Sequence, residues 1–113
     1  MKVCVSHRFN HPYCQRILDL DSLGQLVDEF DSVINDEKSY VRLTAYPENN
    51  RGAFAVIAEV FSNPIFYDEK DKVTKTPVNT MADLLRTIEH ARHDAILKRG
   101  DNGIEIHDVW IGI

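Results

Sequence analysis

The sequence has 113 residues, a formal net charge of −5 and 43% hydrophobic residues. A chain of this length can bury a core without a metal or a disulfide, so we expect one domain over residues 1–113. The negative net charge argues against direct binding of nucleic acid, which requires a basic surface, and favours a basic protein partner. Because the sequence contains neither a signal peptide nor an apolar stretch long enough to span a membrane, we expect a cytoplasmic protein without membrane contact.

Two short strands are expected first, at Lys2–Ser6 and at residues 15–20, the second folding back on the first. The loop between them contains His7, His11 and Cys14. Histidine and cysteine are zinc ligands, so these residues form a candidate zinc site, with His107 or a water as the fourth ligand. The alternative is that the loop only packs or touches a partner.

A capped helix is expected next. Ser22 and Gln25 have the spacing of a capping box, and Asp21 is the competing N-cap. Apolar residues then recur on one helical face, which we expect to lie against a sheet. They are Leu23, Leu26, Val27, Phe30, Val33 and Ile34.

Residues 39–61 predict a long hairpin at the centre of the sheet. Its first arm alternates, so that Val41, Leu43 and Ala45 share one face, and Tyr40, Arg42, Thr44 and Tyr46 share the other. Its second arm, residues 53–60, is apolar except for Glu59, which is typical of a central strand covered on both faces.

Residues 65–67 and 73–78 predict a second hairpin, whose Pro77 confines one strand to a sheet edge. A second helix is expected from Thr80 to Gly100, and a final strand from Gly103 to Ile113. Because that strand carries the large apolar residues Trp110 and Ile111, we expect it to lie inside the sheet or in an interface.

Arg92 falls within the apolar stripe of the second predicted helix. A charge there must either reach past the sheet edge or find a buried partner, with Glu59 and Glu105 as candidates. Taken together, the elements predict an α+β fold: a mostly antiparallel sheet with two helices packed on one face, in a ferredoxin-like βαββαβ order with extra strands.

The charges are unevenly distributed. Residues 17–37 contain seven acidic residues and no Lys or Arg. Such a run is commonly a solvated surface, and the functional alternative is a docking surface for a basic protein. The candidate partner-binding residues are Asp28, Glu29, Asp31, Asp36 and Glu37 on this segment, and Tyr40, Arg42 and Tyr46 on the hairpin.

Common catalytic and phosphate-binding motifs are absent, which argues against the common enzyme classes. In its size, acidity and lack of motifs, the chain resembles toxin-immunity proteins and phage anti-defence proteins. This resemblance implies a stoichiometric inhibitor or neutraliser of a basic, nucleic-acid-handling protein. Two alternatives remain open: a small metal-binding domain or enzyme using the His7, His11 and Cys14 loop, and a structural subunit, such as a homodimer, that assembles through its C-terminal strand.

Overall fold

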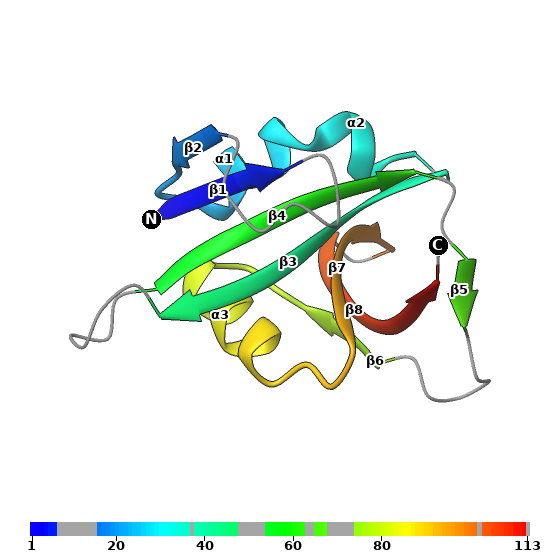
Figure 1. Cartoon of the computed structure of the whole chain (residues 1–113). Coiled ribbons are helices and arrows are strands. Elements are labelled where there is room, and N and C mark those ends of the chain that lie inside the picture. Colours follow the sequence, from blue (N-terminus) through cyan, green and yellow to red (C-terminus); the bar gives the residue numbers. More distant parts are fainter. Residues whose placement is uncertain are drawn as a thin grey trace.

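The structure is a computed structural model that describes residues 1–6, 16–36, 38–47, 54–62, 65–67, 74–101 and 103–112. Figure 1 shows their arrangement, with the helices lying along one curved sheet. In chain order the elements are β1 (Lys2–Ser6), β2 (Arg16–Asp19), α1 (Leu23–Glu29), α2 (Asp31–Ile34), β3 (Ser39–Pro47), β4 (Phe54–Ser62), β5 (Ile65–Tyr67), β6 (Thr74–Pro77), α3 (Met81–Glu89), β7 (Asp94–Gly100) and β8 (Gly103–Gly112).

The strands are ordered β2-β1-β4-β3-β7-β8, and both β6 and β5 pair with β8. Strands β1 and β4 are parallel, whereas the other pairs formed by the described strands are antiparallel. The predicted α+β class with a mostly antiparallel sheet is therefore confirmed. The ferredoxin-like order is not confirmed, because β7 pairs with β3, and β2 occupies the edge of β1 where that fold places its last strand.

The first predicted helix begins at the expected cap but is divided into two. The Gln25 N–H donates to Ser22 Oγ at 3.1 Å, and Gln25 Oε1 accepts from the Asp21 and Ser22 N–H groups, which completes the capping box. At Phe30 the backbone leaves the helical region (φ −110°, ψ 19°), and α2 begins one residue later. The predicted apolar stripe continues across this break and faces the core.

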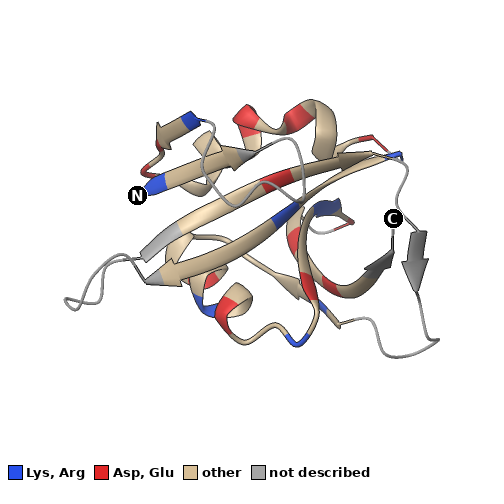
Figure 2. Cartoon of the chain, in the orientation of Figure 1, with Lys and Arg blue, Asp and Glu red and all other residues tan. Residues whose placement is uncertain are grey.

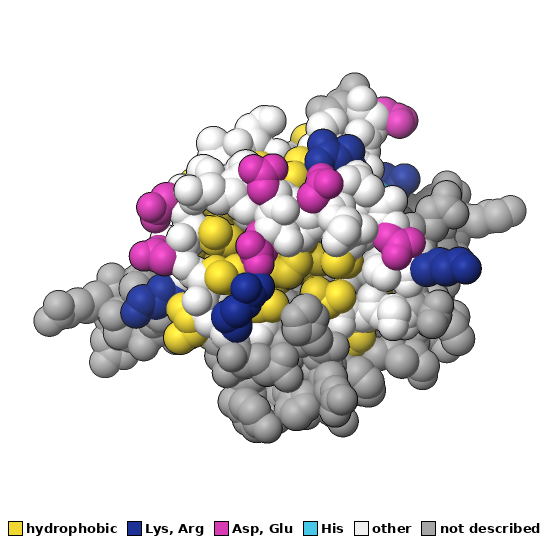
Figure 3. All heavy atoms as spheres, turned by 90° about the horizontal axis from the view of Figure 1, so that it is seen from above, with side chains coloured by type: hydrophobic (Ala, Val, Ile, Leu, Met, Phe, Trp, Pro, Cys, Tyr) yellow, Lys and Arg dark blue, Asp and Glu magenta, His cyan; other side chains and the backbone are white. Residues whose placement is uncertain are grey.

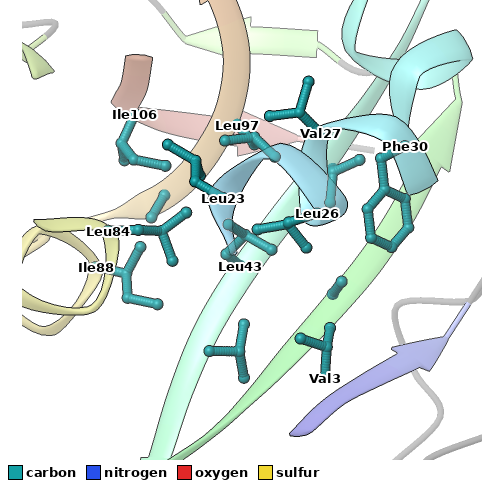
Figure 4. Packing of buried hydrophobic residues seen from close by; sticks show 14 of the residues in the cluster. Val3, Leu23, Leu26, Val27, Phe30, Leu43, Leu84, Ile88, Leu97 and Ile106 are labelled. Atoms are coloured by element: carbon teal, nitrogen blue, oxygen red, sulfur yellow. The ribbon is translucent and has the colours of Figure 1, made fainter. Parts of the chain in front are cut away.

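One aliphatic core lies between the three helices and one face of the sheet. In Figure 4, Leu26 from α1 and Leu84 from α3 point toward Leu43 of β3. All three are almost fully buried. Because α1, α2 and α3 all contribute to this core, the described helices pack on the same face of the sheet, which we call the helix-covered face.

The other face of the sheet, which we call the opposite face, carries a smaller cluster. Successive residues of a strand point to opposite faces, so Tyr40 and Ile96 face away from the aliphatic core that contains Val41 and Leu97. Tyr40 stacks on Phe61 with 4.9 Å between ring centroids. Ile96 and Val109 complete the cluster.

The predicted second hairpin is wrong in its pairing. Strands β5 and β6 do not pair with each other; instead both pair with β8, Phe66 in register with Ile111 and Thr76 with Ile106. Pro77 does sit on an edge strand, as its missing N–H requires. The final strand lies inside the sheet, because β6 and β7 pair with the same residues of β8, 105–108, and so occupy its two edges there.

The second predicted helix is correct only in its first half. Thr80 caps α3 by accepting from the Asp83 N–H at 3.1 Å, but the helix ends at Glu89, and residues 94–100 form β7 instead. Arg92 lies in the exposed turn between α3 and β7, where its backbone N–H donates to Asp108 Oδ2 at 2.9 Å. Its predicted place on a helical apolar stripe is therefore wrong, as is the alternative of a buried pair, because it is Arg42 that pairs with Glu59.

Trp110 is 58% exposed although its strand lies inside the sheet, and the alternative that this strand takes part in an interface remains a prediction. By strand alternation Trp110 shares the helix-covered face with Ile106. Its ring lies 4.5 Å from the ring of His93, in the turn that follows α3. No helix in the described part of the chain is long and apolar enough to cross a membrane.

Candidate functional site

The predicted acidic surface lies on the outer side of α1 and α2. Because Leu26, Phe30 and Ile34 are buried against the sheet, Asp28 and Asp31 project away from the core and are exposed. Glu29 and Asp36 are exposed as well, whereas Glu37 lies outside the described residues. The structure thus gathers Asp28, Glu29, Asp31 and Asp36 on one side of the molecule, and we call these four residues the α1–α2 acidic surface.

Two of these carboxylates have basic neighbours from other elements. Arg16 of β2 pairs with Glu29 at 2.5 Å, and Arg99 of β7 pairs with Asp31 at 3.3 Å. Asp28 forms no ion pair with any described residue. Figure 3, which views this side from above, shows acidic side chains spread over the surface with Lys or Arg beside some of them. The field of the surface is therefore partly neutralised.

Asp36 has a local structural role. Its carboxylate accepts hydrogen bonds from the Lys38 N–H and the Ser39 hydroxyl, both at 3.0 Å, at the entry to β3. The Lys38 N–H, together with the Ser39 hydroxyl, holds the pKa of the Asp36 carboxyl below its usual value. Asp36 is therefore charged and held in place where the acidic surface meets the hairpin.

The hairpin residue Arg42 lies within an ion-pair cluster on the opposite face. Its Nη2 is 2.7 Å from Glu59 Oε1 on β4, and its Nη1 is 3.0 Å from Asp94 Oδ1 on β7. Figure 2 shows the basic position on β3 beside the acidic position on β4. Glu59 is only 7% exposed, so its charge depends on the guanidinium for compensation. We call Arg42, Glu59 and Asp94 the sheet ion triad.

The surroundings of Arg42 hold its guanidinium in place. Burial alone would lower the pKa of Arg42, but the hydrogen bonds to Glu59 and Asp94 raise it above its usual value. The guanidinium carbon also lies 5.1 Å from the centroid of the Phe61 ring, in a cation–π contact. Its Nε is buried with no hydrogen-bond partner among the described residues.

The predicted hairpin residues thus differ in what they offer a partner. Tyr40 is 1% exposed, and burial raises the pKa of its hydroxyl. Arg42 is committed to the sheet ion triad. Tyr46 is half-exposed near the end of β3, so it presents the largest accessible surface of the three. A role for these residues in partner binding remains a prediction.

The candidate zinc ligands His7, His11 and Cys14 lie outside the described residues, so the zinc site remains a prediction. The part of the chain that the structure describes contains no group of three or more His, Cys, Asp or Glu side chains that could hold a metal. His107, the suggested fourth ligand, lies on β8, where its Nε2 is buried 3.7 Å from Glu105 Oε1. Burial lowers the pKa of this imidazole, Lys75 and Lys98 lower it further, and Glu105 opposes them.

A cavity of about 460 Å³, which the sequence did not indicate, lies between α3 and the strands β6 and β8. Arg86, Thr87 and His90 line it from α3, and Ala91 lines it from the following turn. Its remaining lining residues belong to the two strands and are Thr74, Thr76, Ile106 and Asp108. We call this space the α3 cavity. Its residues come from three elements that are brought together only by the fold.

A second space of about 460 Å³ lies on the other side of the turn that links α3 to β7. Its lining includes Thr44 and Tyr46 at the end of β3, together with Glu89 and His93. Arg42 and Asp94 also line it, so the sheet ion triad forms part of its wall.

Comparison of the chain with protein families, with curated proteins and with solved structures finds no match.

Proposed function

We propose that this protein is a stoichiometric binding protein that inhibits or neutralises a basic, nucleic-acid-handling protein, as toxin-immunity and phage anti-defence proteins do. In this proposal α1 and α2 present the α1–α2 acidic surface to the partner. The carboxylates take the place of nucleic-acid phosphates on the partner's basic surface, and their field accelerates the encounter.

The observation that supports this proposal best is that the acidic and the apolar side chains of α1 and α2 lie on opposite sides of these helices. The apolar residues Leu26 and Phe30 are buried, whereas Asp28 and Asp31 point outward and touch none of the aliphatic core. Both carboxylates lie outside the core, although Asp31 is paired with Arg99. Asp28 is the strongest candidate, because it has no ion pair among the described residues.

The alternative of assembly through the C-terminal strand has less support. A second copy could add to β8 only at an open hydrogen-bonding edge, but β6 and β7 already occupy both edges along residues 105–108. The exposed ring of Trp110 is the remaining feature that favours self-association. Measuring the mass in solution for the parent and for Trp110→Ser tests this alternative directly.

The alternative of a metal site rests on residues outside the described ranges. Metal analysis of the purified protein, compared with a His7→Ala and His11→Ala double variant, decides it. Stoichiometric zinc in the parent that is lost in the double variant would favour the metal-binding function.

A matched pair of charge reversals tests the proposed function. One variant carries Asp28→Lys and Asp31→Lys, and the control carries Glu89→Lys and Asp101→Lys, which reverse two exposed acids outside the α1–α2 acidic surface. The net charge changes equally in both. The parent and both variants are used to capture basic proteins from the cells in which the gene is found, and association with the captured protein is then timed across a salt series.

We expect the α1–α2 reversal to slow association at low salt by at least about tenfold, because the carboxylates no longer attract the basic partner. The reversal should also flatten the salt dependence, because salt then has no attraction to screen; at physiological salt the Debye length is about 8 Å. The control should associate at the parental rate. Excess duplex DNA should displace the parent, since both compete for one basic surface. If the reversed protein binds at the parental rate at low salt, the acidic surface is only solvated.

A further inference from the structure

The α3 cavity has the size and the lining of a small-molecule site. Its volume of about 460 Å³ falls within the range of roughly 300–1,000 Å³ typical of ligand sites. Ala91, which is only partly buried, provides apolar surface, and polar groups from α3 and β6 line the space around it. A bare ion would leave most of this space unfilled, so a ligand that fits it also has an apolar body.

The polar groups of the cavity are mainly hydrogen-bond donors. By register, Thr74 and Thr76 of β6 lie beside Asp108 and Ile106 of β8, so their hydroxyls share the face that lines the cavity. Arg86 adds a guanidinium at the rim, held there by Asp83 at 2.7 Å, and this pair uses only part of the guanidinium's five N–H donors.

His90 adds an imidazole, and the hydrogen-bond partner of one ring nitrogen determines that this nitrogen carries a proton. Its Nδ1 lies 2.8 Å from the Arg86 carbonyl oxygen, which can only accept, so Nδ1 carries a proton. Nε2 is then left to meet a ligand, as an acceptor when the ring is neutral and as a donor when the ring is protonated.

The one carboxylate in the lining does not make the cavity a cation site. The two oxygens of Asp108 accept the backbone N–H groups of Arg92 and His93, both at 2.9 Å. The imidazole of His93 lies beside the same carboxylate at 3.5 Å. Asp108 therefore closes the turn after α3, and both of its oxygens are already engaged by backbone N–H groups.

We propose that the α3 cavity binds a small phosphate monoester whose phosphate meets Arg86, Thr74 and Thr76 and whose apolar body lies against Ala91. Phosphate fits because its several oxygens can accept from a guanidinium and from two hydroxyls at once. This site does not involve the α1–α2 acidic surface, so it is independent of the proposed partner binding.

The test titrates the intact protein with phenyl phosphate, with inorganic phosphate and with uncharged phenol, while backbone amide NMR shifts are followed. We expect saturable shifts with phenyl phosphate, centred on residues 74–76, 86–91 and 106–108, and much weaker binding of the other two probes. Arg86→Gln should weaken binding by at least about tenfold, because it removes the one Arg or Lys side chain in the described lining of the cavity. Thr76→Val, which removes one hydroxyl, should weaken it less.

The control is Arg92→Gln, which removes an exposed guanidinium near the cavity that does not line it. Its affinity should equal that of the parent. The proposal is overturned if phenyl phosphate causes no saturable shift up to about 10 mM, or if Arg86→Gln and Arg92→Gln weaken binding equally, which would show nonspecific attraction. Shifts that saturate equally with phenol would also overturn it, because the phosphate would then be irrelevant. The proposed partner binding is unaffected by any of these outcomes.

Discussion

Residues 40–43 of strand β3 are covered on both faces, but by different means. Toward the helices, Val41 and Leu43 pack among aliphatic side chains from the helices and the neighbouring strands. On the opposite face, Tyr40 stacks on an aromatic ring, and Arg42 is held between two carboxylates. The helix-covered face depends on shape and volume, which change little with pH, whereas the opposite face depends on charge pairing. Variants along this one strand can separate the two kinds of stabilisation.

The largest effect is expected from Leu43→Ala on the helix-covered face. Truncating a fully buried leucine removes its transfer free energy and leaves a cavity, which costs about 2–5 kcal/mol of unfolding free energy. Urea unfolding of the parent and the variant measures this loss. Leu43→Met, which conserves volume, should cost less than about 1.5 kcal/mol. A loss below about 1 kcal/mol for the alanine variant would mean that this face is not the main core.

Arg42→Met is expected to come second, at about 2–3 kcal/mol. Removing one partner leaves Glu59 buried without a cation, and breaking a fully buried pair costs about 3–5 kcal/mol. We expect less here because the Arg42 side chain is 30% exposed. Adding Glu59→Leu to Arg42→Met should recover most of the loss. If the double variant is no more stable than the single one, the cost comes from lost packing around Arg42.

A smaller effect is expected from His107→Gln, also on the opposite face. Burial lowers the folded-state pKa of His107, so the unfolded chain takes up the proton first as the pH falls below about 6.5. The parent should therefore lose stability below that pH through this group, and the glutamine variant should lose less. Melting temperatures of both proteins between pH 7.5 and 5 provide the measurement. Parallel curves would show that His107 does not contribute.

The smallest effect is expected from Tyr46→Ser near the exposed end of β3. Because Tyr46 is half-exposed, its replacement should change the free energy of unfolding by less than about 0.5 kcal/mol. If Tyr46 belongs to the partner-binding surface, its loss should weaken partner binding while the melting temperature stays constant. A large loss of stability would place this ring in the fold instead.

The elements whose apolar residues repeat with one clear period were predicted correctly. The Ser22 cap, the stripe of α1 and α2, and the alternating first arm of the hairpin all follow from local spacing. The prediction failed at residues 94–100, where Ala95 and Ile96 continue the stripe of α3 but belong to a short buried strand. Periodicity cannot assign such a short apolar run. Two signals were available: a charge at Arg92 within the stripe, and Asn-Gly at 102–103, the strongest hairpin signal.

The candidate sites could be predicted only where one element defines them. The exposure of Asp28 follows from the pattern of its own helix, so sequence alone placed it. The sheet ion triad joins Arg42 to Asp94 across 52 positions, and Asp94 had been assigned to a helix. The α3 cavity forms only where α3, β6 and β8 meet. The sequence predicted that β6 pairs with β5 instead of β8, so the cavity could not be foreseen.

The parallel pairing of β1 with β4 also has a consequence for the growing polypeptide. Val3 pairs with Val56, so β1 leaves the ribosome long before the strand that holds it in the sheet has been made. Until then, β2 is its only sheet neighbour. The β3–β4 and β7–β8 hairpins join segments close in sequence, and closing their short loops costs less entropy. The nascent chain therefore adds β1 to the sheet only after the β3–β4 hairpin that receives it has been made.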